Sequence, residues 1–208
     1  MSIEVRNKEI TMKKLNHETT MKLILRTFLL VLIVLNVACG AGVLHRPYEA
    51  SGYNVREMTD NLNNDLAVGT FRRTQSDLVQ DPWFIRSLNK MRYARASGHH
   101  DFIADAIANE LMLAQKLDGQ SNLILKGHLL EHKFDDGYGT GVGSIEMAFT
   151  LTADGKVLYA KTKRIEHTWD SAFSALAVGQ AIWAQLAMIE MLINSLVTDM
   201  DFINAVNE

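Results

Sequence analysis

The chain has 208 residues, 22% of them charged, with a formal net charge of −3 at neutral pH and a single cysteine. One thiol excludes a disulfide framework within the chain, so stability has to come from packing. After Cys39 about 170 residues remain, enough for one domain with a sizeable core, and their excess of acidic over basic side chains argues against general nucleic-acid binding.

An apolar run, residues 28–39, follows the positive residues Lys22 and Arg26 and ends in small residues. This order is typical of a secretory signal. The last four residues resemble the lipobox of bacterial lipoproteins, although Asn36 stands where that motif usually has leucine. The resemblance implies cleavage before Cys39 and a fatty acid such as palmitate on its thiol.

Two other interpretations of this segment stay open. Residues 27–44 carry no charge and are about as long as the shortest membrane spans, so the segment could remain as an uncleaved anchor. An ordinary signal peptidase could instead cut beside Ala38 and Gly40. In each case the positive amino-terminal side places the remainder outside the cytoplasm. Residues 1–20 are expected to be a mis-assigned start or a disordered extension, because a compact signal peptide begins at Met21.

These patterns predict three parts. Residues 1–38 form the extension and signal peptide. Residues 39–60, with glycine, serine, Pro47 and scattered charges, are expected to be a tether with little structure. Residues 61–208 form a single domain.

The domain is expected to begin with a short apolar strand at residues 65–71. An Asp-Pro pair at 81–82 and a Ser-Gly pair at 97–98 frame a predicted helix over residues 82–96. A second helix is predicted over residues 101–117, because apolar side chains recur there at helical spacing. Asp101 is its expected N-cap; the apolar stripe comprises Ile103, Ile107, Leu111 and Ala114. The preceding pair, His99 and His100, is expected in a solvated turn.

Strands are predicted for most of the next segment. Residues 123–134 are apolar enough for a largely buried strand, and the glycine-rich residues 135–143 suit a flexible connector or a strand lead-in. Residues 144–152 alternate between apolar and polar side chains, which indicates a half-buried strand. An Asp-Gly turn at 154–155 then leads into a return strand over 157–168.

The last predicted elements are helices. Residues 171–197 are dominated by Ala, Leu, Ile and Met and are interpreted as a buried core helix. A subunit interface and a membrane segment stay open as alternatives. Thr198 and Asp201 are expected to cap a short helix over residues 202–206.

The order of elements predicts an α+β fold, in which an antiparallel-rich sheet of about four strands is packed by two or three helices. The stretches LAVGTF, LMLAQKLDG and GYGTGVGSIEMAFTLTADGKVLYA resemble the fold group of the penicillin-binding-protein activator and curli secretion lipoproteins. The resemblance implies a non-enzymatic accessory protein of the outer membrane that works through protein contacts.

Basic residues cluster before the second predicted helix and form a possible binding patch for phosphates or an acidic partner. The alternative is a solvated, partly packed face. The patch comprises Arg72, Arg73, Arg86, Lys90 and Arg92.

One motif has the order of a catalytic site. His128, Glu131 and His132 spell the HxxEH order of inverted zinc peptidases. On a strand, however, histidines four residues apart point to the same face about 13 Å apart, so they do not converge on one metal ion. A zinc-dependent envelope hydrolase is therefore only the alternative prediction.

We therefore expect a lipid-anchored interaction module at the periplasmic face of the outer membrane, with no cofactor and no catalytic residue. Its expected partners are an envelope protein complex and the membrane. Association with further copies through the final helix stays open.

Overall fold

A computed structural model describes residues 21, 42–80, 83–86, 89–171 and 176–208. The chain separates into two units, residues 1–41 and 42–208. The second unit contains the elements discussed below, whereas the predicted signal sequence and Cys39 lie outside the described residues. In chain order the elements are β1 (Val43–Leu44), α2 (Gly52–Asn61), β2 (Ala67–Arg73), β3 (Phe84–Ile85), β4 (Asn89–Arg92), α3 (His99–Leu113), β5 (Leu123–Asp135), β6 (Gly139–Ala153), β7 (Lys156–Ser171), α4 (Leu176–Val197) and α5 (Met200–Asn207).

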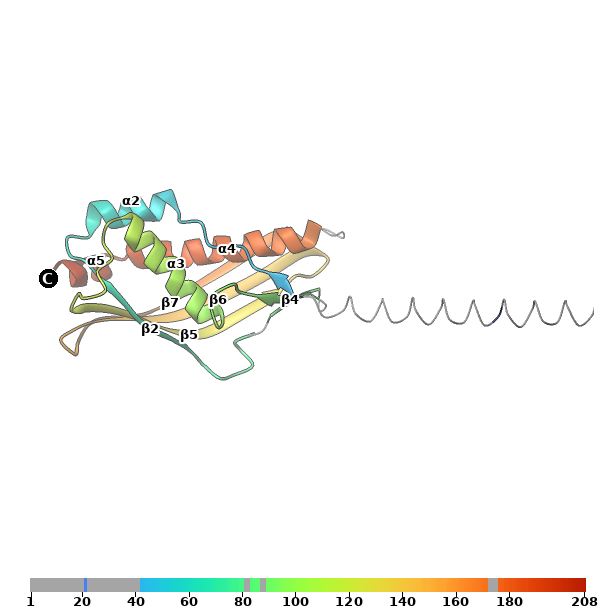
Figure 1. Ribbon diagram of the computed structural model, residues 1–208, viewed down its shortest axis with the longest axis horizontal. Helices are drawn as coiled ribbons and strands as arrows, with labels where there is room; N and C mark the ends of the chain where they lie inside the picture. The colour runs from blue at the N-terminus through green and yellow to red at the C-terminus, as the bar shows by residue number, and fades with distance from the viewer. Residues whose placement is uncertain (1–20, 22–41, 81–82, 87–88, 172–175) are drawn as a thin grey trace, which may run out of the picture. The chain divides into compact units, whose positions relative to one another are not determined.

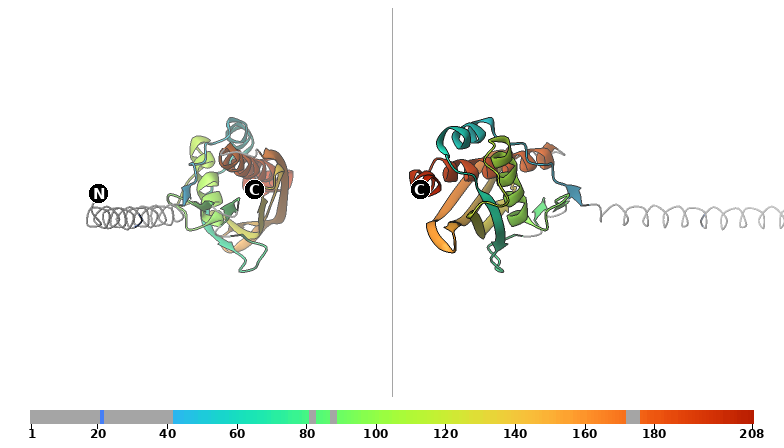
Figure 2. Two further views of the ribbon diagram at one scale, coloured as in Figure 1. Left: turned by 90° about the vertical axis from the view of Figure 1, so that its right-hand side faces the viewer. Right: turned by 60° about the vertical axis from the view of Figure 1, so that its left-hand side comes forward.

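The predicted α+β fold is confirmed. Four strands form the main sheet in the order β2-β5-β6-β7, in which β2 runs parallel to β5 and the other neighbours are antiparallel. Helices α2, α3 and α4 lie on one face of this sheet (Figures 1 and 2). A small sheet has the order β1-β4-β3 and lies at one end of the second unit (Figure 1).

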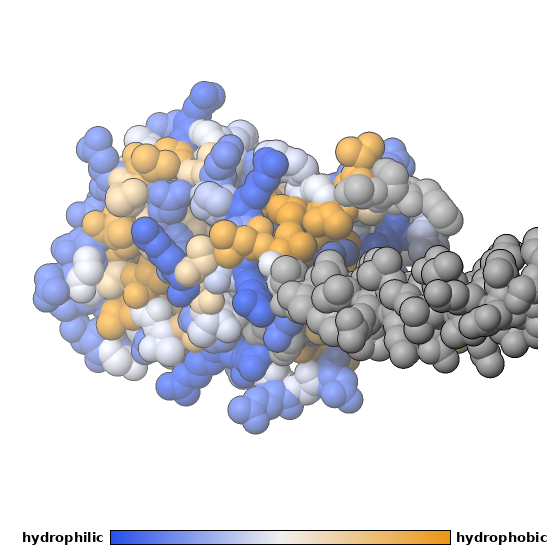
Figure 3. Space-filling model, turned by 45° about the vertical axis from the view of Figure 1, so that its right-hand side comes forward, coloured by the Kyte–Doolittle hydropathy of each residue, from blue (hydrophilic) through white to orange (hydrophobic). Residues whose placement is uncertain are grey.

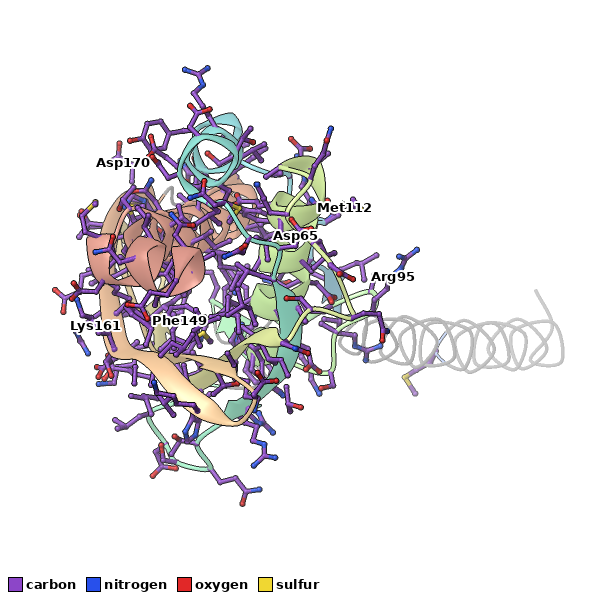
Figure 4. The ribbon with its side chains drawn as sticks, turned by 90° about the vertical axis from the view of Figure 1, so that its left-hand side faces the viewer. Asp65, Arg95, Met112, Phe149, Lys161 and Asp170 are labelled. Atoms are coloured by element: carbon purple, nitrogen blue, oxygen red, sulfur yellow. The ribbon has the colours of Figure 1, made fainter. Side chains whose placement is uncertain are left out.

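The hairpin of β6 and β7 follows the sequence prediction. Ile145, Met147 and Phe149 are buried beneath the helices, and Figure 4 shows Phe149 pointing into the interior. Asp154 and Gly155 connect the strands with φ angles of 48° and 82°. A two-residue loop with both angles positive matches the right-handed twist of the strands and fixes the register.

Helix α3 confirms the second predicted helix but begins two residues earlier, with Gly98 rather than Asp101 as its N-cap. The Asp101 carboxylate instead accepts a hydrogen bond from the backbone N–H of Ser97 at 3.2 Å. The predicted apolar stripe is buried. His99, expected in a solvated turn, is also buried, so that expectation was wrong.

The predicted helix over residues 82–96 is wrong. Its described residues contain strands β3 and β4 of the small sheet. Trp83, Ile85 and Met91 are buried, whereas Phe84 and Arg92 are exposed. This alternation has the period of a strand, and the core formed by distant elements selects it over the local signals for helix ends.

The predicted tether also differs from the structure, because residues 42–60 contain β1 and most of α2. The carboxylate of the buried Glu110 on α3 accepts hydrogen bonds from the Tyr48 hydroxyl at 2.6 Å and the Ser51 backbone N–H at 3.0 Å. Asn54, on α2, donates to the Glu190 carbonyl at 3.1 Å. These contacts hold the segment onto α3 and α4.

Of the helices in the described residues, α4 is the one that is long and apolar enough to cross a membrane. In its most apolar stretch, 56% of the residues are buried inside the protein. It contacts β6 and β7, and its buried side chains include Met188, Ile189, Leu192 and Ile193, as the core-helix interpretation expects. The short helix α5 is capped by Asp199 rather than by Thr198, and the Asp199 carboxylate also accepts bonds from Lys161 and Lys163.

Candidate functional surfaces and buried polar groups

The HxxEH segment lies on β5, but not as the sequence predicted. The pairing of β5 with β6 shifts register between Leu129 and Glu131. Such a bulge inserts an extra residue and changes which side chains share a face. His128 is therefore exposed and contacts Thr74 at 3.2 Å, whereas His132 is buried in the core. The expectation that both histidines share a face was wrong, and the two cannot bind one metal ion.

Glu131 is committed to ionic contacts on the opposite face of the main sheet. Its carboxylate accepts hydrogen bonds from the Ser144 hydroxyl at 2.6 Å and from Lys133 at 3.1 Å, and it lies 3.0 Å from the Arg164 guanidinium. The Ser144 bond, followed by the two cations, lowers the pKa of Glu131 to about 2. Arg164 also pairs with Glu146 and Glu166. A carboxylate so stabilised is a poor general base at neutral pH.

A surface pocket of about 440 Å³ lies beside this charge cluster. Its lining includes Asp77, Gln80, Lys133 and Glu166 together with Glu131. The pocket offers charges of both signs and hydrogen-bonding groups. In chemistry it suits a polar protein contact better than an apolar ligand.

His99 and His132 form a stacked pair in the core. Their ring centroids are 3.5 Å apart, with 23° between the ring planes. His99 contacts Gln185 through Nδ1 at 3.0 Å and the Gln80 carbonyl through Nε2 at 3.0 Å, and it also meets the Tyr93 hydroxyl. Neither ring nitrogen of His132 has a hydrogen-bond partner among the described residues. Ring stacking therefore joins β5 to α3, and the contact between His99 and Gln185 joins α3 to α4.

Burial keeps these imidazoles neutral. It lowers the pKa of His132 to about 3, and it lowers the pKa of His99 well below its ordinary value, with the neighbouring His132 acting in the same direction. The nearby His45 has its pKa lowered by burial as well. Within the described part of the chain, no three His, Cys, Asp or Glu side chains converge in a way that could hold a metal ion.

The five residues of the predicted basic patch fall into separate places. Arg72 and Arg73 lie on β2 in the main sheet, whereas Lys90 and Arg92 lie on β4 in the small sheet. Arg86 is largely buried: it lies 3.5 Å from the Asp136 carboxylate, donates to the Ser171 hydroxyl at 2.8 Å and covers the Tyr138 ring at 4.2 Å.

An open groove of about 820 Å³ runs between α3 and the segments that follow β1 and β4. Its lining is mostly apolar and includes Leu44, Phe102 and Met112, with Arg46 and Arg95 among the charged members. Figure 4 shows Arg95 and Met112 on the outside of the molecule. Figure 3 shows an apolar band on the face that is turned toward the viewer in that figure.

A scan of protein-family models and a search of curated proteins find no match to this chain. Solved structures do match. A Xanthomonas campestris protein of family DUF330 has a TM-score of 0.52 at 14% identity, over 78% of this chain and 92% of that chain. This likeness shows a shared fold alone.

Two further matches are bacterial lipoproteins by name. The minor lipoprotein of Acinetobacter baumannii has a TM-score of 0.36 at 11% identity and covers 67% of this chain and 92% of its own. The rare lipoprotein B of Shewanella oneidensis has a TM-score of 0.34 at 11% identity, with coverage of 64% and 87%. At these scores the matches carry no argument about this chain.

Proposed function

We propose that the chain is an exported accessory protein of the bacterial envelope. An acylated Cys39 holds it at the periplasmic face of the outer membrane, and it acts through contacts rather than catalysis. This proposed role follows what the sequence resemblance to penicillin-binding-protein activator and curli secretion lipoproteins implies.

The proposal rests on the observation that the buried titratable groups with strongly shifted pKa values have structural roles. Glu131 forms ion pairs with Lys133 and Arg164, and His99 and His132 stack in the core. Catalytic sites need perturbed groups that face a cleft and a positioned partner. Here His99 and His132 are enclosed in the core, and Glu131, although it lines the surface pocket, is held by Ser144, Lys133 and Arg164.

The chain length between the anchor and the fold supports attachment close to the membrane. Two residues, Gly40 and Ala41, separate Cys39 from Gly42, where the described domain begins. The three steps of extended chain from Cys39 to Gly42 span at most about 11 Å. Because residues 42–60 are packed against the domain rather than free, the domain would stay near the bilayer.

Fatty-acid labelling in cells tests the anchor. We expect the wild-type protein to incorporate a clickable fatty acid and the Cys39→Ala variant to lose the label. A matched Ser51→Ala variant, changed on the folded side of the anchor, should keep it. Label retained in Cys39→Ala would contradict lipidation at this residue.

The partner is proposed to be an envelope protein complex with an acidic surface, which contacts the exposed arginines of β2. Charge reversal at Arg72 and Arg73, followed by crosslinking in cells, tests this surface. We expect the crosslinked species to be lost, while reversal of Lys156 at the distant hairpin turn leaves it intact. An unchanged crosslinking pattern in the Arg72 and Arg73 variant would rule this surface out.

A further inference from the structure

We infer that the folded domain itself lies on the bilayer through the outward face of the small sheet. This surface, called here the bilayer face, comprises Leu44, Phe84, Lys90 and Arg92. The inference rests on the proposed function, because it takes Cys39 as the lipid anchor.

Strand pairing brings these four side chains together. Leu44 of β1 is paired with Arg92 of β4, and Phe84 of β3 is paired directly with Lys90 of β4. Side chains at paired positions share one face of a sheet, as do residues two apart along a strand. The four residues therefore form a compact group of two apolar and two basic side chains.

The opposite face of the small sheet is committed to the core. Ile85 and Met91 are buried, and α4 contacts β3. Leu44 remains 62% exposed and Phe84 45% exposed. The sheet therefore has one face packed on the protein and one apolar, basic face directed outward.

Tyr138 adds an exposed aromatic side chain at this end of the domain. Tyr138, in the turn between β5 and β6, lies under the Arg86 guanidinium at 4.2 Å and is exposed. Arg86 follows Phe84 by two residues. The left view of Figure 2 looks onto this end of the domain.

This composition matches the surface of a phospholipid bilayer. Exposed apolar and aromatic side chains enter the boundary between headgroups and acyl chains, while Lys and Arg remain at the phosphates. Each cation near an anionic surface contributes favourably to such binding. No carboxylate belongs to the four paired positions.

The position of the anchor selects the bilayer over other occupants. Gly42 lies beside Arg92, since a Cβ atom built at Gly42 would meet the Arg92 side chain. The chain from Cys39 to Gly42, with two residues between them, reaches at most about 11 Å. A lipid on Cys39 would therefore hold the bilayer next to this face.

Depth-dependent quenching tests the inference on the full chain. The acylated protein is purified from membranes and reconstituted in vesicles of phosphatidylethanolamine and phosphatidylglycerol, some with nitroxide-labelled lipid. Single cysteines are introduced by Leu44→Cys and Phe84→Cys and labelled with an environment-sensitive fluorophore. Matched controls are Val157→Cys and Leu78→Cys, whose native side chains are similarly exposed, at 55% and 47%.

We expect several-fold stronger quenching at positions 44 and 84 than at 157 and 78. Equal quenching at the four positions would overturn the inference and leave the bilayer face to a protein partner. Labelling of the protein that carries no introduced cysteine would expose a free Cys39 thiol, which separates failure of the anchor from failure of the face.

Charge reversal supplies a second readout. In phosphatidylglycerol vesicles, Lys90→Glu combined with Arg92→Glu should reduce quenching at position 84 several-fold, whereas Lys156→Glu should leave it unchanged. An undiminished signal in the double variant would contradict the role assigned to the two cations.

Discussion

The buried imidazole of His132 is a site where pH should act on stability. Its pKa is lowered from 6.5 to about 3 by burial. Between these values the unfolded chain binds more protons than the folded chain, so the free energy of unfolding decreases as the pH falls. One such histidine contributes a slope of about 1.4 kcal/mol per pH unit below pH 6.5.

We predict that His132→Leu flattens this slope. Urea unfolding of the full chain in detergent at pH 7 and pH 5 measures it. The exposed His128 provides the matched control, and His128→Leu should retain the wild-type slope. A slope as steep in His132→Leu as in wild type would show that acid acts elsewhere.

The charge cluster of β5, β6 and β7 leads to a second prediction. Glu131→Gln removes the charge that faces Ser144, Lys133 and Arg164, and should lower the free energy of unfolding by about 1–3 kcal/mol. Glu166, which also pairs with Arg164 but is 69% exposed, is the control, and its change to glutamine should cost less than about 0.5 kcal/mol. Similar unfolding midpoints for the two variants would contradict the role of Glu131.

Glu131 also makes stability depend on pH, but for a different reason. Whereas burial lowers the pKa of His132, hydrogen bonds and cations lower the pKa of Glu131 because they favour its charged form. Its folded pKa of about 2 lies below its ordinary value of 4.5. Its contribution to stability is therefore present above pH 4.5 and lost as the pH falls through 2. Glu131→Gln should reduce the acid dependence in this lower window, whereas His132→Leu acts below pH 6.5.

Single residues also show where sequence analysis reached its limit. The order HxxEH is visible in the sequence, but the bulge that sends His128 outward and His132 inward depends on pairing with β6. The burial of His99 depends on the tertiary contacts of α3. A histidine carries no local signal that separates a stacked core position from a solvated turn.

At the scale of elements, replacement of the glycine in the β6–β7 turn is predicted to destabilise the protein. Gly155→Ala forces a side chain into a positive φ of 82° and should cost about 1 kcal/mol. Gly179 is exposed within α4, with no atom near a Cβ built there, so Gly179→Ala should stabilise the protein by about 0.5–1 kcal/mol. Thermal unfolding compares them, and a shift of the same sign in both would contradict this account.

Elements set by local patterns were predicted well. The β6–β7 hairpin follows from alternation and an Asp-Gly pair, and α3 follows from helical periodicity. The segment around β3 and β4 was misassigned because Pro82 and Gly98 resemble helix boundaries, while the deciding contacts of Trp83 come from Phe134 and the buried histidines. Helix α2 was missed because its few buried residues, Asn54 and Met58, leave little apolar periodicity.

At the scale of the whole molecule, the fold places helices on one face of the sheet and a small sheet near the start of the domain. The class and the main sheet could be predicted from the sequence. The basic patch could not, since its residues are near in sequence but divide between two sheets. Lys90 and Arg92 lie on β4, where they form the bilayer face together with Leu44 and Phe84.

The central claim is that a lipid on Cys39 holds this domain in the envelope. Intact-mass measurement of the protein extracted from bacterial membranes tests it most directly. We predict a mature chain that begins at Cys39 and carries the additional mass of fatty acyl groups, with no unmodified thiol. A chain that retains residues 21–38, or one whose Cys39 is free, would contradict the claim.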